Sequence, residues 1–225
     1  MDRTSYPQTK GNIPSRHSER ARYDIDTVHS ILDAGRIAHV AFVADGLPQV
    51  LPMLYVRVGE ALYLHGSTGA HFNRVAARKK GITVAVGVTL VDEFVLARST
   101  FSHSANYRSV VARGEAFIVT SEERKAEVLD ALVERLIPGR SADARKPTSD
   151  ELRQTGVLEL QLEEVSAKVR TGDPIDTEQD LGSPCWAGVL PITVAWGAAR
   201  PSADLSGGIE VPPYLAAGAP AAWLG

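Results

Sequence analysis

The sequence predicts a mainly β protein, an antiparallel barrel with helices packed on its outside. Apolar, β-branched segments follow one another through very short connections. Asp45-Gly46 and Gly59-Glu60 in these connections are typical of tight hairpin turns. Consecutive hairpins favour an antiparallel barrel over a parallel α/β sheet. We expect strands at 37–43, 49–58, 62–64, 82–90, 94–99, 110–120 and 157–165, and a last apolar stretch at 186–196.

Four segments between and before these strands have helical spacing or helix-end signals. Asp24 is placed to cap a helix that Gly35 ends. Thr120 and Glu123 have the spacing of a capping box, and the apolar residues after them recur on one helical face. The other two helices are expected from about 68 to 79 and around 149–154.

Prolines and a glycine mark irregular places in the strands. Pro48 and Pro52 cannot donate to a ladder, so their strand is expected at an edge, at a bulge or against a ligand. Gly114 is expected at a bulge. Outside the barrel domain at 24–197, a polar extended arm at 1–23 and an Ala-, Pro- and Gly-rich tail at 198–225 are expected.

Composition excludes several classes of protein. The formal net charge of -3 gives no general attraction to nucleic acid. Cys185 is the single cysteine, which excludes an internal disulfide and a cysteine-based zinc site. No apolar run approaches the length of a membrane span, and no signal-peptide core is present. We therefore expect a soluble, cytoplasmic protein without bound metal.

The stretch 62–78 is the first candidate binding site. An expected strand runs into the polar turn His65-Gly66-Ser67-Thr68-Gly69, and a basic helix with His71, Arg74 and Arg78 follows. Free backbone N–H groups and the positive end of the helix dipole converge at such a helix start and bind anions. An ordinary strand–turn–helix connection is the alternative.

Two further polar clusters suit a phosphorylated ligand. Residues 99–109 gather hydroxyl, amide and cationic side chains, and Lys168 and Arg170 are spaced to point to one face of a strand. A solvated loop and a solvated strand face are the alternatives. The side chains of the first of these clusters are Ser102, His103, Ser104, Asn106, Tyr107 and Arg108.

Several separated motifs resemble one family. They are HGSTG at 65–69, ARSTFSHSANYRSVVARGEA at 97–116, AKVRTGDP at 167–174 and CWAGVLP at 185–191. Together they are similar, over about residues 25–195, to the flavin-nucleotide-binding branch of the pyridoxamine 5′-phosphate oxidase-like superfamily, whose relatives include nitroimidazole-resistance proteins. The resemblance implies a split β-barrel that binds FMN at the interface of a homodimer.

The resemblance also implies roles for single residues. Met53, Leu54 and Tyr55 would lie against the isoalloxazine ring, partly through backbone groups. The segment 65–67 would follow the ring and the ribityl chain. Asn106, Tyr107 and Arg108 would make further cofactor contacts, and Lys168, Arg170 and Trp186 would cover the flavin from the second subunit.

The phosphate site departs from the pattern of the true oxidases. Where these have a Ser-Arg-Lys run, this chain has Gly69, Ala70 and His71. The phosphate would then rely on His71, on Arg74 and on the backbone amides near Thr68. Residues that bind the substrate phosphate in the true oxidases are not recognisable, which argues against pyridoxamine phosphate oxidation itself.

The resulting expectation is an FMN-dependent oxidoreductase that acts on a small molecule, with NAD(P)H as a candidate electron donor. Flavin would carry the redox chemistry, and the protein would supply orientation and field. His65 and His103 are candidates for a catalytic role. One alternative is a flavin-binding or storage protein. Another is a haem- or deazaflavin-binding protein on the same barrel, with His65, His71 or His103 as the axial-ligand candidate for haem.

Overall fold

The computed structural model describes residues 3–216, so the predicted tail lies outside the described residues from 217 onward. The strands are β1 (Ala21–Arg22), β2 (Ile37–Ala44), β3 (Leu47–Val58), β4 (Ala61–Ser67), β5 (Ile82–Leu96), β6 (Ser104–Ile118), β7 (Thr155–Gln161), β8 (Glu164–Arg170) and β9 (Gly188–Pro191). The helices are η1 (Ser18–Arg20), α1 (Ile25–Ala34), α2 (His71–Lys79), α3 (Glu122–Leu136), α4 (Arg140–Asp143), α5 (Ser149–Gln154) and α6 (Pro213–Ala216).

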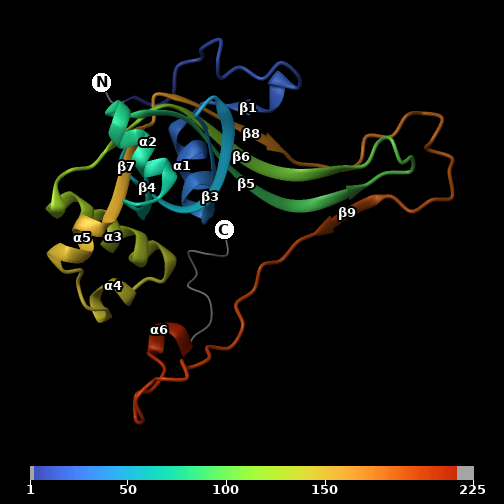
Figure 1. The fold of residues 1–225 in the computed structure, drawn as a ribbon. Helices are drawn as coiled ribbons and strands as arrows, with labels where there is room; N and C mark the ends of the chain where they lie inside the picture. The colour runs from blue at the N-terminus through green and yellow to red at the C-terminus, as the bar shows by residue number, and fades with distance from the viewer. Residues whose placement is uncertain (1–2, 217–225) are drawn as a thin grey trace.

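One nine-stranded antiparallel sheet forms the body of the molecule (Figure 1). Its order is β1-β8-β6-β7-β4-β3-β2-β5-β9, and β6 also pairs with β5. That last pairing closes a ring through β6, β7, β4, β3, β2 and β5. The mainly β, antiparallel architecture with helices outside the sheet, expected from the hairpin signals, is confirmed.

The core follows the side-chain alternation of the strands. On β2, Ala38, Val40 and Phe42 are buried while the residues between them are more exposed. Helix α1 inserts Ile31 and Leu32 into the same cluster. As expected, the Asp24 side chain caps α1 by accepting from the Thr27 N–H at 2.8 Å. The hairpin turns at 45–46 and 59–60 and helix α5 also lie where the sequence places them.

Four local expectations are wrong. The segments 82–90 and 94–99 form one strand, β5, whose register shifts between Val91 and Glu93. That irregularity accommodates the polar residues that suggested a break, and the ladder passes Gly114 without a shift. Helix α3 is capped by Ser121, one residue after the expected Thr120, because the Ser121 side chain accepts from Arg124 N–H. Helix α2 begins at His71, three residues later than expected.

The N-terminal arm is docked on the barrel, contrary to the expectation of an extended segment. Tyr6 is 2% exposed, and its hydroxyl donates to Glu60 Oε2 at 2.9 Å and lies 2.9 Å from His29 Nε2. Asn12 donates to the Val165 carbonyl, and β1 pairs with β8. The buried Tyr6 ring, the Asn12 bond and the pairing of β1 with β8 together anchor the arm.

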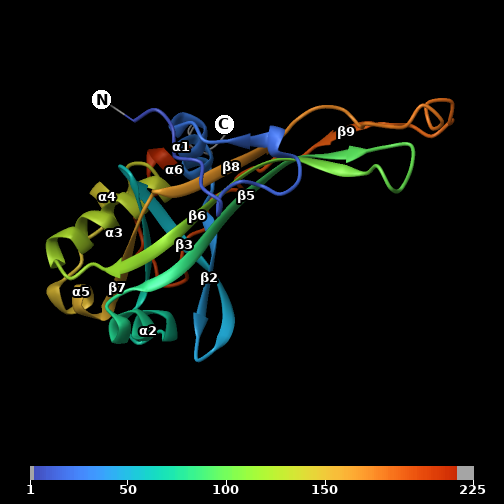
Figure 2. The same cartoon turned by 90° about the horizontal axis from the view of Figure 1, so that it is seen from above.

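The paired ends of β5 and β6, with β9 beside β5, form an extension that projects far beyond the rest of the sheet (Figures 1 and 2). Helix α2 lies at the opposite side of the molecule in both views. Among the described residues, no helix is both long and apolar enough to cross a membrane. The extension and the segment that follows it expose large apolar side chains, namely Val91, Phe94, Phe101, Ile175, Leu181, Trp186 and Leu190.

Candidate functional site

The first candidate site lies where β3 and β4 stop pairing. These two strands pair from Val58↔Ala61 to Tyr55↔Leu64. Beyond that point, the 47–54 part of β3 pairs with β2 alone, and the 65–67 part of β4 pairs with β7 alone. Pro48 and Pro52 lie on this one-sided part of β3, which agrees with the edge position that their missing N–H groups predict.

His65 bridges the two diverging strands. Its ring forms a hydrogen bond with the backbone of Leu54, and its Nδ1 is buried without a partner among the described residues. Burial lowers the pKa of His65, and the bond with Leu54 opposes this shift. Met53 and Leu54 are half-buried beside it. The Tyr55 side chain belongs to the core, where its hydroxyl donates to the Leu32 carbonyl, so only its backbone can face a ligand.

The turn after β4 leads into an uncapped helix start. Thr68 N–H donates to the Gln154 carbonyl at 3.0 Å, and Gly69 N–H donates to Ser67 Oγ at 3.2 Å. The N-cap of α2 is Ala70, which has no side-chain oxygen to satisfy the first N–H groups of the helix. The first turn carries no acidic residue. Its positive dipole end is therefore open to an anion.

Asn73 holds this turn through a hydrogen bond, a role that sequence reasoning did not predict. It is 4% exposed, and its Nδ2 donates to the Ser67 carbonyl at 3.0 Å. Its Oδ1 is buried without a partner in the described part of the chain. The side chain occupies the space that the paired Gly66 and Gly156 leave open, since a Cβ on Gly156 would lie 2.5 Å from Asn73 Oδ1. The available signal for this role was that the polar Asn73 directly follows Phe72, a buried apolar residue of the same helix.

The cations of α2 differ in their surroundings. His71 Nε2 lies 3.5 Å from Asp45 Oδ2, and both side chains are exposed. Arg74 is exposed one turn into the helix, and no carboxylate of residues 3–216 lies within 4.0 Å of its guanidinium. Arg78 is exposed at the other end of the helix. Arg74 is thus the arginine nearest the uncapped N-terminus.

The second predicted cluster is a network across β5, β6 and β8. Asn106 is 1% exposed and donates to Glu93 Oε2 at 2.5 Å, and it accepts from the Arg170 guanidinium. Arg108 Nη2 donates to Asp92 Oδ1 at 2.8 Å. The strand pairing brings Tyr107 beside Arg170. Asp92 and Glu93, which sequence reasoning placed in a connection, provide the carboxylates.

His103 lies in the hairpin loop at the tip of the extension. Its Nδ1 is 2.8 Å from the Ser99 carbonyl oxygen. Because a carbonyl only accepts, Nδ1 must carry the hydrogen, and Nε2 is left with its lone pair. The ring is exposed.

The remaining predicted residues have separate places. Lys168 Nζ donates to the Arg16 carbonyl at 3.2 Å and so holds the N-terminal arm. Trp186 is 67% exposed in the segment before β9. Within one chain, the extension that carries 103–108 and Trp186 lies away from α2 (Figures 1 and 2). A single subunit therefore does not bring the two predicted halves of the site together.

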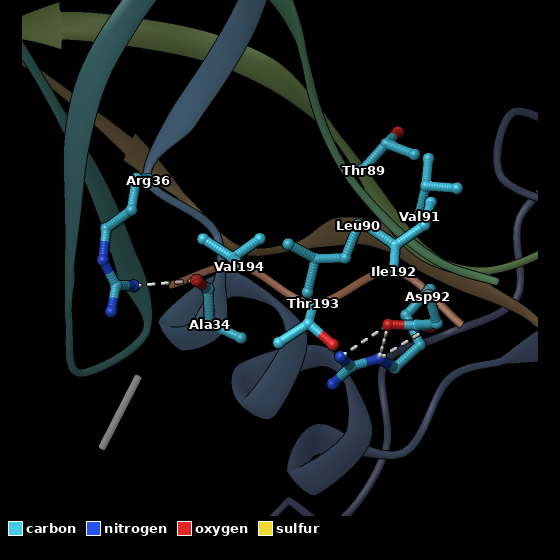
Figure 3. Close-up of a pocket in the computed structure, with 10 residues that line it drawn as sticks. Ala34, Arg36, Thr89, Leu90, Val91, Asp92, Ile192, Thr193 and Val194 are labelled. Atoms are coloured by element: carbon cyan, nitrogen blue, oxygen red, sulfur yellow. Dashed lines mark hydrogen bonds and ion pairs between the residues drawn. The ribbon is translucent and has the colours of Figure 1, made fainter. Parts of the chain in front are cut away.

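A cavity of about 580 Å³ lies at the root of the extension (Figure 3). Arg36 and the Asp92–Arg108 ion pair line it, together with Thr89. Its volume is in the usual range for a small-molecule pocket. The rest of the wall is mostly apolar: Ala34, Leu90, Val91, Ile192, Thr193 and Val194.

A family model described as pyridoxamine 5′-phosphate oxidase matches residues 24–169. This chain belongs to that pyridoxamine 5′-phosphate oxidase-like family. The family resemblance drawn from the four motifs is thereby confirmed. No curated protein matches the chain.

Two solved structures are similar over most of the chain. The flavocytochrome Anf3 from Azotobacter vinelandii is 34% identical, with a TM-score of 0.87 over 94% of this chain and 97% of that one. The FAD and heme binding protein from Mycobacterium smegmatis is 36% identical, with a TM-score of 0.82 over 88% and 96%. A 5-nitroimidazole antibiotic resistance protein from Bacteroides thetaiotaomicron, 21% identical with a TM-score of 0.55 over 66% and 86%, shares the fold.

Proposed function

We propose that this protein binds a flavin nucleotide whose phosphate sits at the start of α2. The observation that carries the proposal is the uncapped helix start at Ala70 with Arg74 one turn behind it. A phosphate brings nearly two negative charges, which this helix terminus and a guanidinium complement. The similarity to an FAD and heme binding protein supports the same assignment.

The neighbouring groups fit the rest of such a molecule. His65 Nδ1 and Asn73 Oδ1 are buried polar atoms without partners in the described residues, and both flank the turn. The Asn73 side chain fixes the Ser67 carbonyl, so it can hold the turn against which the ribityl chain would lie. The unpaired side of β3 at 47–54 offers backbone N–H and C=O groups at the level of Met53 and Leu54. A planar ring with polar edges matches that strand edge.

We further propose that the site is completed by a second copy of the chain. The extension exposes large apolar side chains, such as Phe101 at 96%, which association with a second copy would cover. A two-fold partner would place its extension over the α2 turn, with Asn106, Tyr107, Arg108 and Trp186 beside the flavin. Lys168 and Arg170 belong to the same extension, although both already contact groups of their own chain.

The proposed activity is oxidation or reduction of a small molecule, with FMN or FAD as the flavin and NAD(P)H as a candidate donor. The flavin supplies hydride and electron transfer when bound. The lowered pKa of His65 keeps its imidazole neutral near pH 7. As a hydrogen-bond partner, His65 would orient the flavin ring. His103 lies in the loop between β5 and β6, and this hairpin projects away from α2 (Figure 1). His103 would therefore not act on the flavin of its own subunit.

Haem is a second candidate cofactor, and the geometry of His103 favours it. The two similar structures from Azotobacter vinelandii and Mycobacterium smegmatis are described by haem as well as flavin, as a flavocytochrome and as an FAD and heme binding protein. His103 has the arrangement of a metal-ligating histidine, with Nδ1–H on a backbone carbonyl and Nε2 facing outward. His65 fits this role less well because its Nδ1 is buried, and His71 Nε2 faces Asp45.

The visible spectrum of the purified protein tests both assignments. Flavin absorption bands are expected, and bleaching by NADPH with recovery in air would support catalysis over storage. A Soret band that is lost in His103→Ala and kept in His17→Ala is expected for the haem site. A colourless protein that binds neither FMN nor FAD on titration would contradict the flavin assignment. Light scattering should give a dimer, and a flavin-loaded monomer would contradict the shared site.

A further inference from the structure

A second cationic cavity lies between the N-terminal arm and β8, apart from the α2 turn. Its volume is about 500 Å³. Arg20, Arg22 and Arg170 line it with their guanidinium groups or stems, and Val169 and Pro174 add apolar wall. Figure 1 shows β1 of the arm running beside β8 at this edge of the sheet.

Arg170 is a buried cation without a counter-ion. It is 7% exposed, and its guanidinium donates only to neutral oxygens: Asn106 Oδ1, the Gly172 carbonyl at 3.3 Å and the Asp173 carbonyl at 3.4 Å. No carboxylate within residues 3–216 lies within 4.0 Å of it. Burial, followed by the nearby Arg20 charge, lowers the pKa of Arg170. Burying a charge is costly unless an opposite charge accompanies it.

The other two arginines add to the positive charge. Arg22 Nη1 donates to the Glu19 and Ala21 carbonyls at 2.8 Å and meets no carboxylate among the residues that the structure describes. Arg20 Nε is 3.6 Å from Glu19 Oε1, an oxygen that also lies 3.1 Å from His17 Nδ1. The cavity wall thus contains three arginines but only two carboxylates, those of Glu19 and Asp173, so its net charge is positive.

The cavity is built into the fold rather than formed by a loose terminus. Lys168 Nζ holds the Arg16 carbonyl, and the Arg113 guanidinium holds the Gly11 carbonyl. Strand pairing of Ala21 with Lys168 fixes the register of the arm. A site whose walls are ordered before binding loses less entropy when a ligand arrives.

We propose that this cavity binds the diphosphate of a nucleotide. Guanidinium groups match phosphate oxygens in charge and geometry, and the anion would compensate Arg170. The cavity is larger than a phosphate group needs, and the apolar wall at Val169 and Pro174 can take a sugar or a base. The diphosphate would belong to a free nucleotide, because the diphosphate of a bound FAD stays with its flavin phosphate at the start of α2.

The double variant Arg20→Ala/Arg22→Ala tests this site without disturbing the buried Arg170. Its control, Arg145→Ala/Arg153→Ala, removes the same charge from exposed side chains near α5. The nucleotide released from each purified protein is identified, and ADP and inorganic pyrophosphate are titrated by calorimetry. We expect the arm variant to bind ADP at least about tenfold more weakly than wild type and control.

The outcomes separate this site from the flavin site. Weaker ADP binding with unchanged flavin content supports a nucleotide site of its own in the arm cavity. The proposal is overturned if wild type does not bind ADP at about 1 mM. It is also overturned if the arm variant equals its control. A colourless protein that binds ADP through the arm would contradict the flavin site alone.

Discussion

The α2 turn and the arm cavity are both prepared for anions, but they hold their charge differently. At the α2 turn, backbone N–H groups provide much of the attraction, and Arg74 stands exposed in water. In the arm cavity, Arg170 is buried, and the pairing of β1 with β8 brings Arg20 and Arg22 to it. Binding at the first site should therefore be separable from folding, whereas binding at the second should depend on the arm.

Removal of the arm's anchor should have the largest effect. Tyr6→Ala deletes a side chain that is 2% exposed, and such aromatic truncations cost about 3–5 kcal/mol. Urea unfolding followed by tryptophan fluorescence measures the loss. Tyr6→Phe keeps the ring but removes the bonds with Glu60 and His29, so it should cost only about 0.5–1.5 kcal/mol. A Tyr6→Ala protein as stable as wild type would show that the arm is not part of the cooperative fold.

A smaller effect is expected beneath the α2 turn. Gly156→Ala places a Cβ 2.5 Å from Asn73 Oδ1, so Asn73 must move, at a cost of about 1–3 kcal/mol. Flavin affinity should fall with it because Asn73 supports the Ser67 carbonyl. Gly182→Ala, where nothing lies within 4 Å, is the control and should change neither. If both variants retain the same stability and flavin content, Asn73 does not position the turn.

The smallest effect is a pH dependence. Burial lowers the pKa of His65, and burial with the nearby Arg57 charge lowers that of His29. The unfolded chain then binds more protons than the folded one below about pH 6.5, so stability should fall as the pH drops from 7 to 5. His65→Gln should show a shallower slope in denaturant unfolding at the two pH values. A slope identical to that of wild type would mean that the folded protein takes up this proton without cost.

The sequence predicted what depends on local pattern. Hairpin turns, the Asp24 cap and the strand–turn–helix at the candidate site follow from neighbouring residues. The prolines of β3 even indicated its one-sided part, because a missing N–H has a direct structural consequence. The motifs carried the family, which the match over 24–169 confirms.

Contacts between distant segments were not predictable from one sequence. Asn73 meets Gly156, and Asp92 meets Arg108, across separations that no local pattern encodes. The docking of the arm was not predictable from its polar composition, because it depends on the buried Tyr6 and on pairing with the distant strand β8. The contact of Arg170 with Asn106 likewise joins residues that are far apart in the sequence.

The most direct test of the flavin site compares two arginines of one helix. Arg74 lies one turn from the uncapped start of α2, whereas Arg78 is exposed near its other end. The dissociation constant of FMN and FAD is measured by flavin fluorescence for Arg74→Ala and Arg78→Ala. We expect Arg74→Ala to bind about 10- to 100-fold more weakly with unchanged stability, and Arg78→Ala to match wild type. Equal affinities in the two variants would contradict a flavin phosphate at the start of α2.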